Sequence, residues 1–311
     1  MIEASIDLAG TRELLDRLQL SLDFQVHTTP VPNILADFGL ATTVGNLDYW
    51  RSADDSFWIG DRVTGAVAHL VAKSAQLQLW QGSLVGGSGA FALAIASPLE
   101  NRRYFWHSFV RSAVALYLSD RGYTPIHAAA LVDPLGKLWL FGGYTHAGKS
   151  TLTIGLLEAG WGYLGDDGLL LGDSEAGVVA HSWWGSSLLD PILVASYPHL
   201  ERHLGEWIGQ RRSIDLRECY RSQWVVQQVP VRLAFPQLDR TEPLARLRDI
   251  SPGMALAQLM QHSAPWLLEN PQPHLQRLQA LCVQSEHFSL HLGVTARTQP
   301  DRVAAILEPM G

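Results

Sequence analysis

Apolar and polar positions follow a short-strand rhythm in the first third of the chain. Between Leu47 and Gly82, brief apolar bursts are separated by turn residues such as Asp54-Asp55 and Gly60-Asp61. This rhythm is typical of a small antiparallel sheet. Before it, leucines recur at helical spacing between Thr11 and Leu22, which predicts a short helix. We therefore expect a β-rich domain at residues 1–100.

Helical and strand patterns alternate in the rest of the chain. Helical spacing of apolar residues predicts four helices, at 103–118, 151–159, 273–281 and 302–307. Ser251-Pro252 predicts the start of another, with Ser251 as the N-cap. Strands are predicted at 128–132, 137–141, 161–165, 168–172, 178–182 and 287–292. Beyond about Pro191 the pattern becomes less regular. From the alternation of helices and strands we expect an α/β domain at 101–311.

A hairpin and a glycine-rich loop stand at the centre of this second domain. Asp133-Pro134-Leu135-Gly136 predicts a tight turn between the strands 128–132 and 137–141. The next segment, Gly143–Ser150, matches G-x-x-x-x-G-K-[ST] without a gap and precedes a predicted helix. In this context backbone N–H groups and the helix dipole bind phosphate. The predicted nucleotide-binding residues are Gly143, Tyr144, Thr145, His146, Ala147, Gly148, Lys149, Ser150 and Thr151.

Two residues of this loop have specific expected roles. Lys149 would reach the β- and γ-phosphates, and the Ser150 hydroxyl would bind Mg²⁺. We expect the Lys149 side chain to lie outside the core. An antiparallel hairpin leading into such a loop is unusual, because most of these loops follow parallel strands.

Composition and charge narrow the functional classes. Apolar residues make up 47% of the 311 residues and charged residues 17%, which predicts a folded protein with a sizeable core. The net charge of −7 argues against a nucleic-acid partner. Two distant cysteines fit neither a disulfide framework nor a cysteine-based zinc site. The sequence shows neither a signal-peptide pattern nor a long apolar run, so we expect a cytoplasmic protein without a membrane partner.

Three landmarks in one order suggest a family. His127 precedes the strand 128–132, the hairpin leads into the glycine loop, and Asp166-Asp167 ends the strand after the loop's helix. This arrangement resembles the catalytic domain of the HPr kinase/phosphorylase family, which is similar to the nucleotide-binding core of phosphoenolpyruvate carboxykinase. The resemblance covers about residues 104–311. It implies an α/β P-loop kinase domain with a mixed, partly antiparallel sheet, which uses ATP and Mg²⁺ to phosphorylate a serine-type hydroxyl.

The resemblance also implies roles for individual residues. Lys149 and Ser150 match the P-loop pair, and His127 matches the histidine that faces the phosphates. Asp166 and Asp167 match the acids that bind metal and orient or deprotonate the acceptor. We expect Asp167 to act on the acceptor hydroxyl and Asp166 to bind the metal. Asp190 is a candidate second metal ligand.

The departures from the family pattern concern the substrate. Tyr144, Thr145 and His146 stand where the family has small residues, and the family's Glu-x-Arg-Gly-x-Gly signature, tied to phosphorylase activity, is absent from the sequence. The chain therefore resembles the kinase-only relatives, some of which modify serine in biosynthetic peptides while others act on small molecules.

Several alternatives remain open on sequence alone. The favoured acceptor is a Ser or Thr of a peptide or small protein, because the extra first domain suggests a partner that must be gripped. A free serine-type metabolite and a non-catalytic nucleotide-binding switch are the alternatives. Arg211 and Arg212 are either phosphate clamps or a solvated charge pair. A homo-oligomer is left open.

Overall fold

The computed structural model divides the chain into two compact units, residues 1–121 and 122–311. We expected a boundary at residue 100. The helix α3 (Arg111–Asp120) contacts the strand β5 (Val67–Val71), which assigns it to the first unit. The residues that the structure describes are 9–20, 23–27, 42–44, 47–51, 56–61, 67–71, 76–80, 111–143, 147–183, 186–208, 210–239, 241–263, 271–296 and 300–307.

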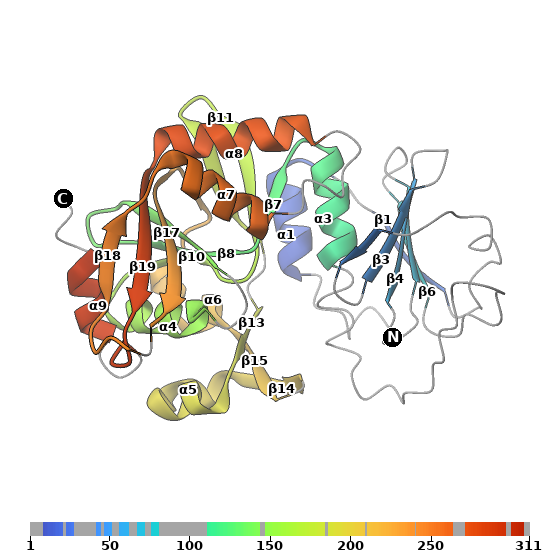
Figure 1. The fold of residues 1–311 in the computed structure, drawn as a ribbon. Coiled ribbons are helices and arrows are strands. Elements are labelled where there is room, and N and C mark those ends of the chain that lie inside the picture. The colour runs from blue at the N-terminus through green and yellow to red at the C-terminus, as the bar shows by residue number, and fades with distance from the viewer. Residues whose placement is uncertain are drawn as a thin grey trace. The chain divides into compact units, whose positions relative to one another are not determined.

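The first unit contains a sheet whose described strands follow the order β1-β6-β5-β4-β3-β2 (Figure 1). Strands β2 to β6 pair antiparallel, which confirms the predicted antiparallel sheet, and β1 pairs parallel with β6. The predicted helix is α1, and it ends before Gln19, whose φ of 55° is incompatible with a continuing helix. The remaining bounds are α1 (Ala9–Arg17), β1 (Asp23–His27), β2 (Thr42–Val44), β3 (Leu47–Arg51), β4 (Ser56–Asp61) and β6 (Gln76–Trp80).

The second unit is organised around a mixed sheet in the order β10-β8-β9-β17-β19-β18 (Figure 1). Strands β9, β17 and β19 are mutually parallel, whereas β10, β8 and β18 pair antiparallel with their neighbours. The predicted mixed, partly antiparallel sheet is therefore confirmed. The bounds are β8 (Ala128–Val132), β9 (Leu138–Gly142), β10 (Gly162–Gly165), β17 (Pro230–Leu238), β18 (Arg246–Asp249) and β19 (Glu286–Leu292).

The hairpin β8–β9 forms as predicted, with Ala128 opposite Gly142 and Val132 opposite Leu138. Asp133 fixes its turn, because Oδ1 accepts hydrogen bonds from the backbone N–H groups of the second and fourth residues after it, at 3.0 and 2.8 Å. Gly136 adopts a φ of 78°, which glycine tolerates without steric cost. The turn therefore follows from its own residues.

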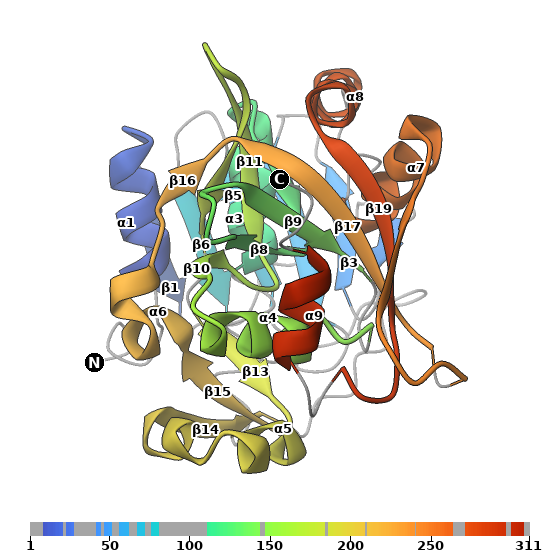
Figure 2. The same cartoon turned by 90° about the vertical axis from the view of Figure 1, so that its left-hand side faces the viewer.

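The two faces of this sheet are covered by different layers (Figure 2). Because side chains alternate along a strand, one face of β8 and β9 packs with α4 and α9, and the other with the second sheet, α7 and α8. The first set includes Ala129, Leu131, Trp139 and Phe141, and the second Ala128, Ala130, Leu138 and Leu140. The helices are α4 (Lys149–Glu158), α7 (Pro252–His262), α8 (Gln272–Gln284) and α9 (Pro300–Leu307). The antiparallel second sheet has the order β16-β12-β11-β7, with β7 (Thr124–Ile126), β11 (Leu169–Ser174), β12 (Gly177–Ser182) and β16 (Gln227–Gln228).

A third, smaller sheet forms where the sequence pattern is loose. Its order is β13-β15-β14, all antiparallel (Figure 1). Its strands and the short helices near them are β13 (Ser186–Leu189), α5 (Pro191–Ser196), η6 (Pro198–His203), β14 (Leu204–Ile208), β15 (Arg211–Asp215), α6 (Leu216–Cys219) and η7 (Arg221–Gln223). Across the part of the chain that is described, none of the helices is both long and apolar enough to cross a membrane.

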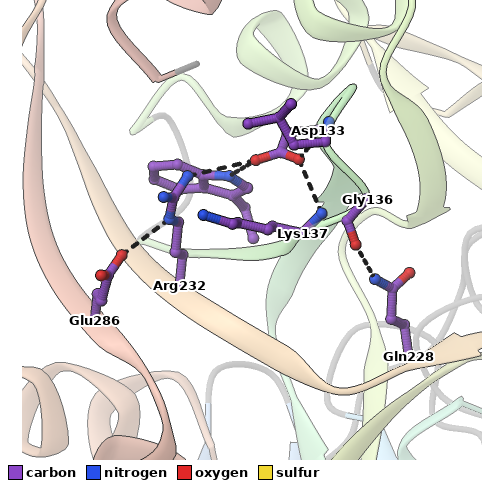
Figure 3. Close-up of polar contacts among 8 residues, drawn as sticks. Asp133, Gly136, Lys137, Gln228, Arg232 and Glu286 are labelled. Atoms are coloured by element: carbon purple, nitrogen blue, oxygen red, sulfur yellow. Dashed lines mark hydrogen bonds and ion pairs between the residues drawn. The ribbon is translucent and has the colours of Figure 1, made fainter. Parts of the chain in front are cut away.

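The sequence pattern did not predict the strand β17, which lies between β9 and β19 in the mixed sheet. Arg232 interrupts its apolar pattern, yet the side chain is 1% exposed. Its Nε donates to Glu286 Oε2 at 3.0 Å, and Nη1 lies 3.4 Å from Asp133 Oδ2 (Figure 3). The guanidinium also lies over the Trp139 ring, and the indole Nε1 donates to Asp133 Oδ2 at 3.0 Å. A buried charge is tolerated here because it is paired and hydrogen-bonded.

Candidate active site

A cleft of about 680 Å³ lies at one edge of the mixed sheet. The parallel strands β9, β17 and β19 end at this edge, and antiparallel pairing makes β8 begin and β10 end there. Ligands of open α/β sheets bind outside the carboxyl ends of the strands. The cleft lining includes His127, Lys149, Ser150, Asp167 and Asp190, which come from separate segments of the sequence.

The glycine loop is described at its two ends. Tyr144, Thr145 and His146 lie outside the described residues. A Cβ on Gly143 would lie 3.2 Å from the Cβ of Ala147, so the two ends of the loop approach closely. At Gly148, the N-cap of α4, φ is 92° and a Cβ would lie 3.0 Å from Leu292 Cδ1. A side chain at either position would therefore be tightly placed, and at Gly148 it would also be strained by the backbone conformation.

Lys149 is the first residue of α4, and its side chain bends back over the loop. Its Nζ donates to the carbonyl oxygen of Gly143 at 2.7 Å. The residue is only 5% exposed although it lines the cleft, so the expectation that it lies outside the core is wrong. The cause is that the stem is buried while the ammonium is held at the loop. Ser150 and Thr151 follow it and also line the cleft.

His127 and Asp167 form a pair in the cleft. His127 Nε2 lies 2.9 Å from Asp167 Oδ1, and the two side chains are 36% and 28% exposed. The backbone N–H of His127 donates to the carbonyl oxygen of His262, the last residue of α7, at 2.7 Å. Asp167 has a φ of 64°, a conformation uncommon outside glycine that aspartate tolerates better than most residues. Such conformations cluster at functional sites.

Asp166 has different surroundings from Asp167. It is 1% exposed, and neither carboxylate oxygen makes a hydrogen bond within the described part of the chain. Burial and the charge of Asp167 raise the pKa of Asp166 to about 7, while the charge of Lys149 acts in the opposite direction. The hydroxyl of Ser187 also lowers this pKa, although it lies outside full hydrogen-bond geometry. Its carboxylate oxygens could hold a cation, although Asp166 itself is not part of the cleft lining.

Asp190 and the two arginines of β15 take distinct positions. Asp190 caps α5, because its Oδ1 accepts from the N–H of Ile192 at 2.8 Å, and it lines the cleft. Arg211 also lines the cleft. Its neighbour Arg212 instead donates to the carbonyl oxygens of Leu204 and Gly205. The arginine pair therefore divides between the cleft and the small sheet.

The residues present fit a magnesium–nucleotide complex. In the described ranges, no group of three or more His, Cys, Asp or Glu side chains could hold a metal by itself. Mg²⁺ bound with a nucleotide needs only one or two carboxylates besides the phosphates. Ser150 and Asp167 supply oxygens in the cleft, and the carboxylate of Asp166 lacks hydrogen-bond partners in the described part of the chain.

Several cleft residues carried no motif in the sequence. Leu238 ends β17, and Leu292 and Val294 lie at and after the end of β19. His262 is not part of the cleft lining, but its Cδ2 lies 3.4 Å from the position of a Cβ on Gly142. Burial, followed by the charges of His127 and Lys149, lowers the pKa of His262 to about 4. Leu238, Leu292 and Val294 line the cleft only because of how the strands are ordered.

Comparisons with known proteins add a fold likeness. No protein-family model matches the sequence, and no curated protein matches it. Among the solved structures that match is the "Hpr(Ser) kinase/phosphatase from Coxiella burnetii", with 14% identity and a TM-score of 0.33. That match covers 59% of this chain and 93% of the other. A TM-score this low carries no argument.

Proposed function

We propose that this protein is an ATP- and Mg²⁺-dependent phosphotransferase that moves the γ-phosphoryl group to a hydroxyl. The observation that carries the proposal is the His127–Asp167 pair, 2.9 Å apart, in the same cleft as Lys149 and Ser150. A protein that only binds a nucleotide needs the loop but has no use for a positioned base. Phosphoryl transfer depends on positioning and charge stabilisation, which this set supplies.

The residues divide the reaction between them. Lys149 and the N-terminus of α4 bind the phosphates. Asp167 accepts the proton of the acceptor hydroxyl while the oxygen of that hydroxyl bonds to the γ-phosphorus. The bond between the γ-phosphorus and the bridging oxygen breaks, and that oxygen leaves with ADP. His127 holds the Asp167 carboxylate in place through their hydrogen bond. Ser150 and Asp166 would hold Mg²⁺, which would supply positive charge to neutralise the phosphates.

For the acceptor, we favour a Ser or Thr of a peptide or small protein. Arg211 and Asp190 also line the cleft, and a cation and an anion there would suit a polar acceptor. The first unit, with its sheet β1–β6, would provide the additional grip. A free serine-type metabolite is the alternative acceptor, and a nucleotide-binding switch is the alternative function.

The test measures ADP and phosphorylated product with the full-length protein, Mg-ATP and three conditions: a Ser/Thr peptide set, free serine, or no acceptor. Phosphopeptide formation supports the proposal, and phosphoserine from free serine alone selects the metabolite alternative. Tight ATP binding without transfer to any acceptor supports the switch. Release of pyrophosphate from a phosphorylated acceptor supplied with inorganic phosphate would contradict a kinase-only activity.

A further inference from the structure

The cleft edge of the mixed sheet presents its functional segments in a fixed order. Asp167 follows β10, His127 precedes β8, and the glycine loop follows β9. On the other side of that loop, β17 ends at Leu238 and β19 ends at Leu292 (Figure 1). The loop therefore lies between the His127–Asp167 pair and the ends of two parallel strands.

The segments that follow these two strands form one connected surface, which we call the β17–β19 ledge (Leu238, Asp239 and residues 292–296). The N–H of Asp239 donates to the carbonyl oxygen of Leu292 at 2.9 Å. The N–H of Val294 donates to the carbonyl oxygen of Glu242 at 3.0 Å. These bonds tie the two segments together, so the ledge has a defined shape beside the cleft.

Apart from Asp239 and Thr295, the ledge is apolar, and it adjoins the phosphate end of the cleft. Leu238 and Val294 are 54% and 58% exposed although both line the cleft. Leu238 Cδ2 and Leu292 Cδ1 lie 3.3 and 3.0 Å from the position that a Cβ on Gly148 would occupy. Exposed apolar side chains in a ligand cleft mark a binding surface for an apolar group.

We propose that the β17–β19 ledge binds the nucleoside of the nucleotide whose phosphates lie on the loop, an inference that rests on the proposed function. A base placed on the ledge directs the γ-phosphate away from it, toward His127 and Asp167. The acceptor does not fit this place, because its hydroxyl must meet Asp167 on the other side of the loop. The ligand class is a nucleoside triphosphate whose planar base packs against aliphatic side chains.

Gly293 gives the ledge a point at which it can be tested. A Cβ on this residue would lie 2.6 Å from the carbonyl oxygen of Leu244 and 2.7 Å from its backbone N and C. Backbone atoms cannot rotate away as a side chain can, so Gly293→Ala must move the two segments apart. Gly253 in α7 is a matched control, because its added Cβ would meet nothing within 4 Å.

The experiment titrates the full-length protein calorimetrically with Mg-ATP and with magnesium tripolyphosphate, which has no nucleoside. We expect the unmodified protein to bind ATP more tightly than tripolyphosphate. Gly293→Ala should weaken ATP binding by about tenfold or more, the effect of losing part of the apolar contact, and leave tripolyphosphate binding unchanged. Gly253→Ala should change neither affinity.

A second variant keeps the proposal testable if Gly293→Ala does not fold. Leu238→Ser with Val294→Ser removes two exposed side chains, so it should fold and show the same selective loss for ATP. Equal affinity of the unmodified protein for both ligands overturns the ledge alone, as does an equal loss for both ligands in the serine variant. Binding of neither ligand overturns the proposed function as well.

Discussion

The buried charge network around Asp133 permits a quantitative stability prediction (Figure 3). The Asp133 side chain is fully buried, and its carboxylate accepts from two backbone N–H groups of the turn and from Trp139 Nε1. It also faces Arg232, which pairs in addition with Glu286, whose side chain is 61% exposed. Asp133→Ala removes all of these acceptors and deprives the buried guanidinium of its buried carboxylate partner, so that Glu286, which is exposed to solvent, must pair with it.

Breaking a buried ion pair by removing one partner costs about 3–5 kcal/mol, so we expect a loss of this size in the free energy of unfolding. Glu286→Gln is the matched control, because an exposed partner contributes less than about 1 kcal/mol. Unfolding in guanidinium chloride, followed through the transition of the second unit, measures the free energy of unfolding of both variants. Adding Arg232→Met to Asp133→Ala should recover about 1–3 kcal/mol relative to additivity, because the orphaned charge is then gone.

The network lies at the turn of the hairpin, away from the end that carries His127 and the glycine loop. Folded Asp133→Ala protein should therefore bind ATP with unchanged affinity. Equal costs for Asp133→Ala and Glu286→Gln, or full additivity with Arg232→Met, would refute the reasoning that burial makes this pair critical.

Three further predictions concern the cleft and the second sheet. Lys149→Met should weaken ATP binding and abolish transfer. Because the side chain is only 5% exposed, the melting temperature of the variant must be compared with that of the unmodified protein to show that it is folded. Normal affinity and turnover in the folded variant would contradict the role assigned to Lys149. Asp167→Asn should bind Mg-ATP nearly normally but transfer phosphate about a hundredfold more slowly, as expected for a lost base; a retained rate with lost magnesium dependence would reverse the roles of the two acids. Hydrogen bonds from Arg277 hold the pKa of Asp173 below its usual value, so their stabilisation is present above the unfolded pKa of about 3.9 and is lost as pH falls through the folded pKa. Arg277→Leu should therefore be less stable than the unmodified protein at pH 7. The difference in melting temperature between the two proteins should become smaller below about pH 4. A difference that stays constant with pH would show that Asp173 does not contribute.

Local chemistry was enough to predict many elements. The hairpin turn follows from Asp133 and Gly136, whose hydrogen bonds and φ lie within a few residues of sequence. The start of α7 follows from Ser251, whose Oγ accepts from the N–H of Met254. The helix α4 and the strands β8 to β12 were predicted for the same reason. In each of these elements, the determining feature is either a contact between residues close in sequence or a regular helical or strand spacing of apolar residues.

Strand β17 shows why other elements were missed. Arg232 breaks its apolar pattern and is accommodated only by partners from the hairpin turn and from β19. Pro236 is another strand breaker, and it is tolerated because pairing with β9 ends at Ala234. Both residues argue against a central strand until their distant neighbours are known.

The sequence by itself determined which segments we propose to carry chemistry: a glycine-rich loop, a histidine before one strand and paired acids after another. It did not determine their geometry. The 2.9 Å contact of His127 with Asp167, the burial of Lys149 and the ledge beyond the loop all depend on which strand ends share one sheet edge. Periodicity records which side chains face a core but not which strands pair, so this order was decided by non-local contacts alone.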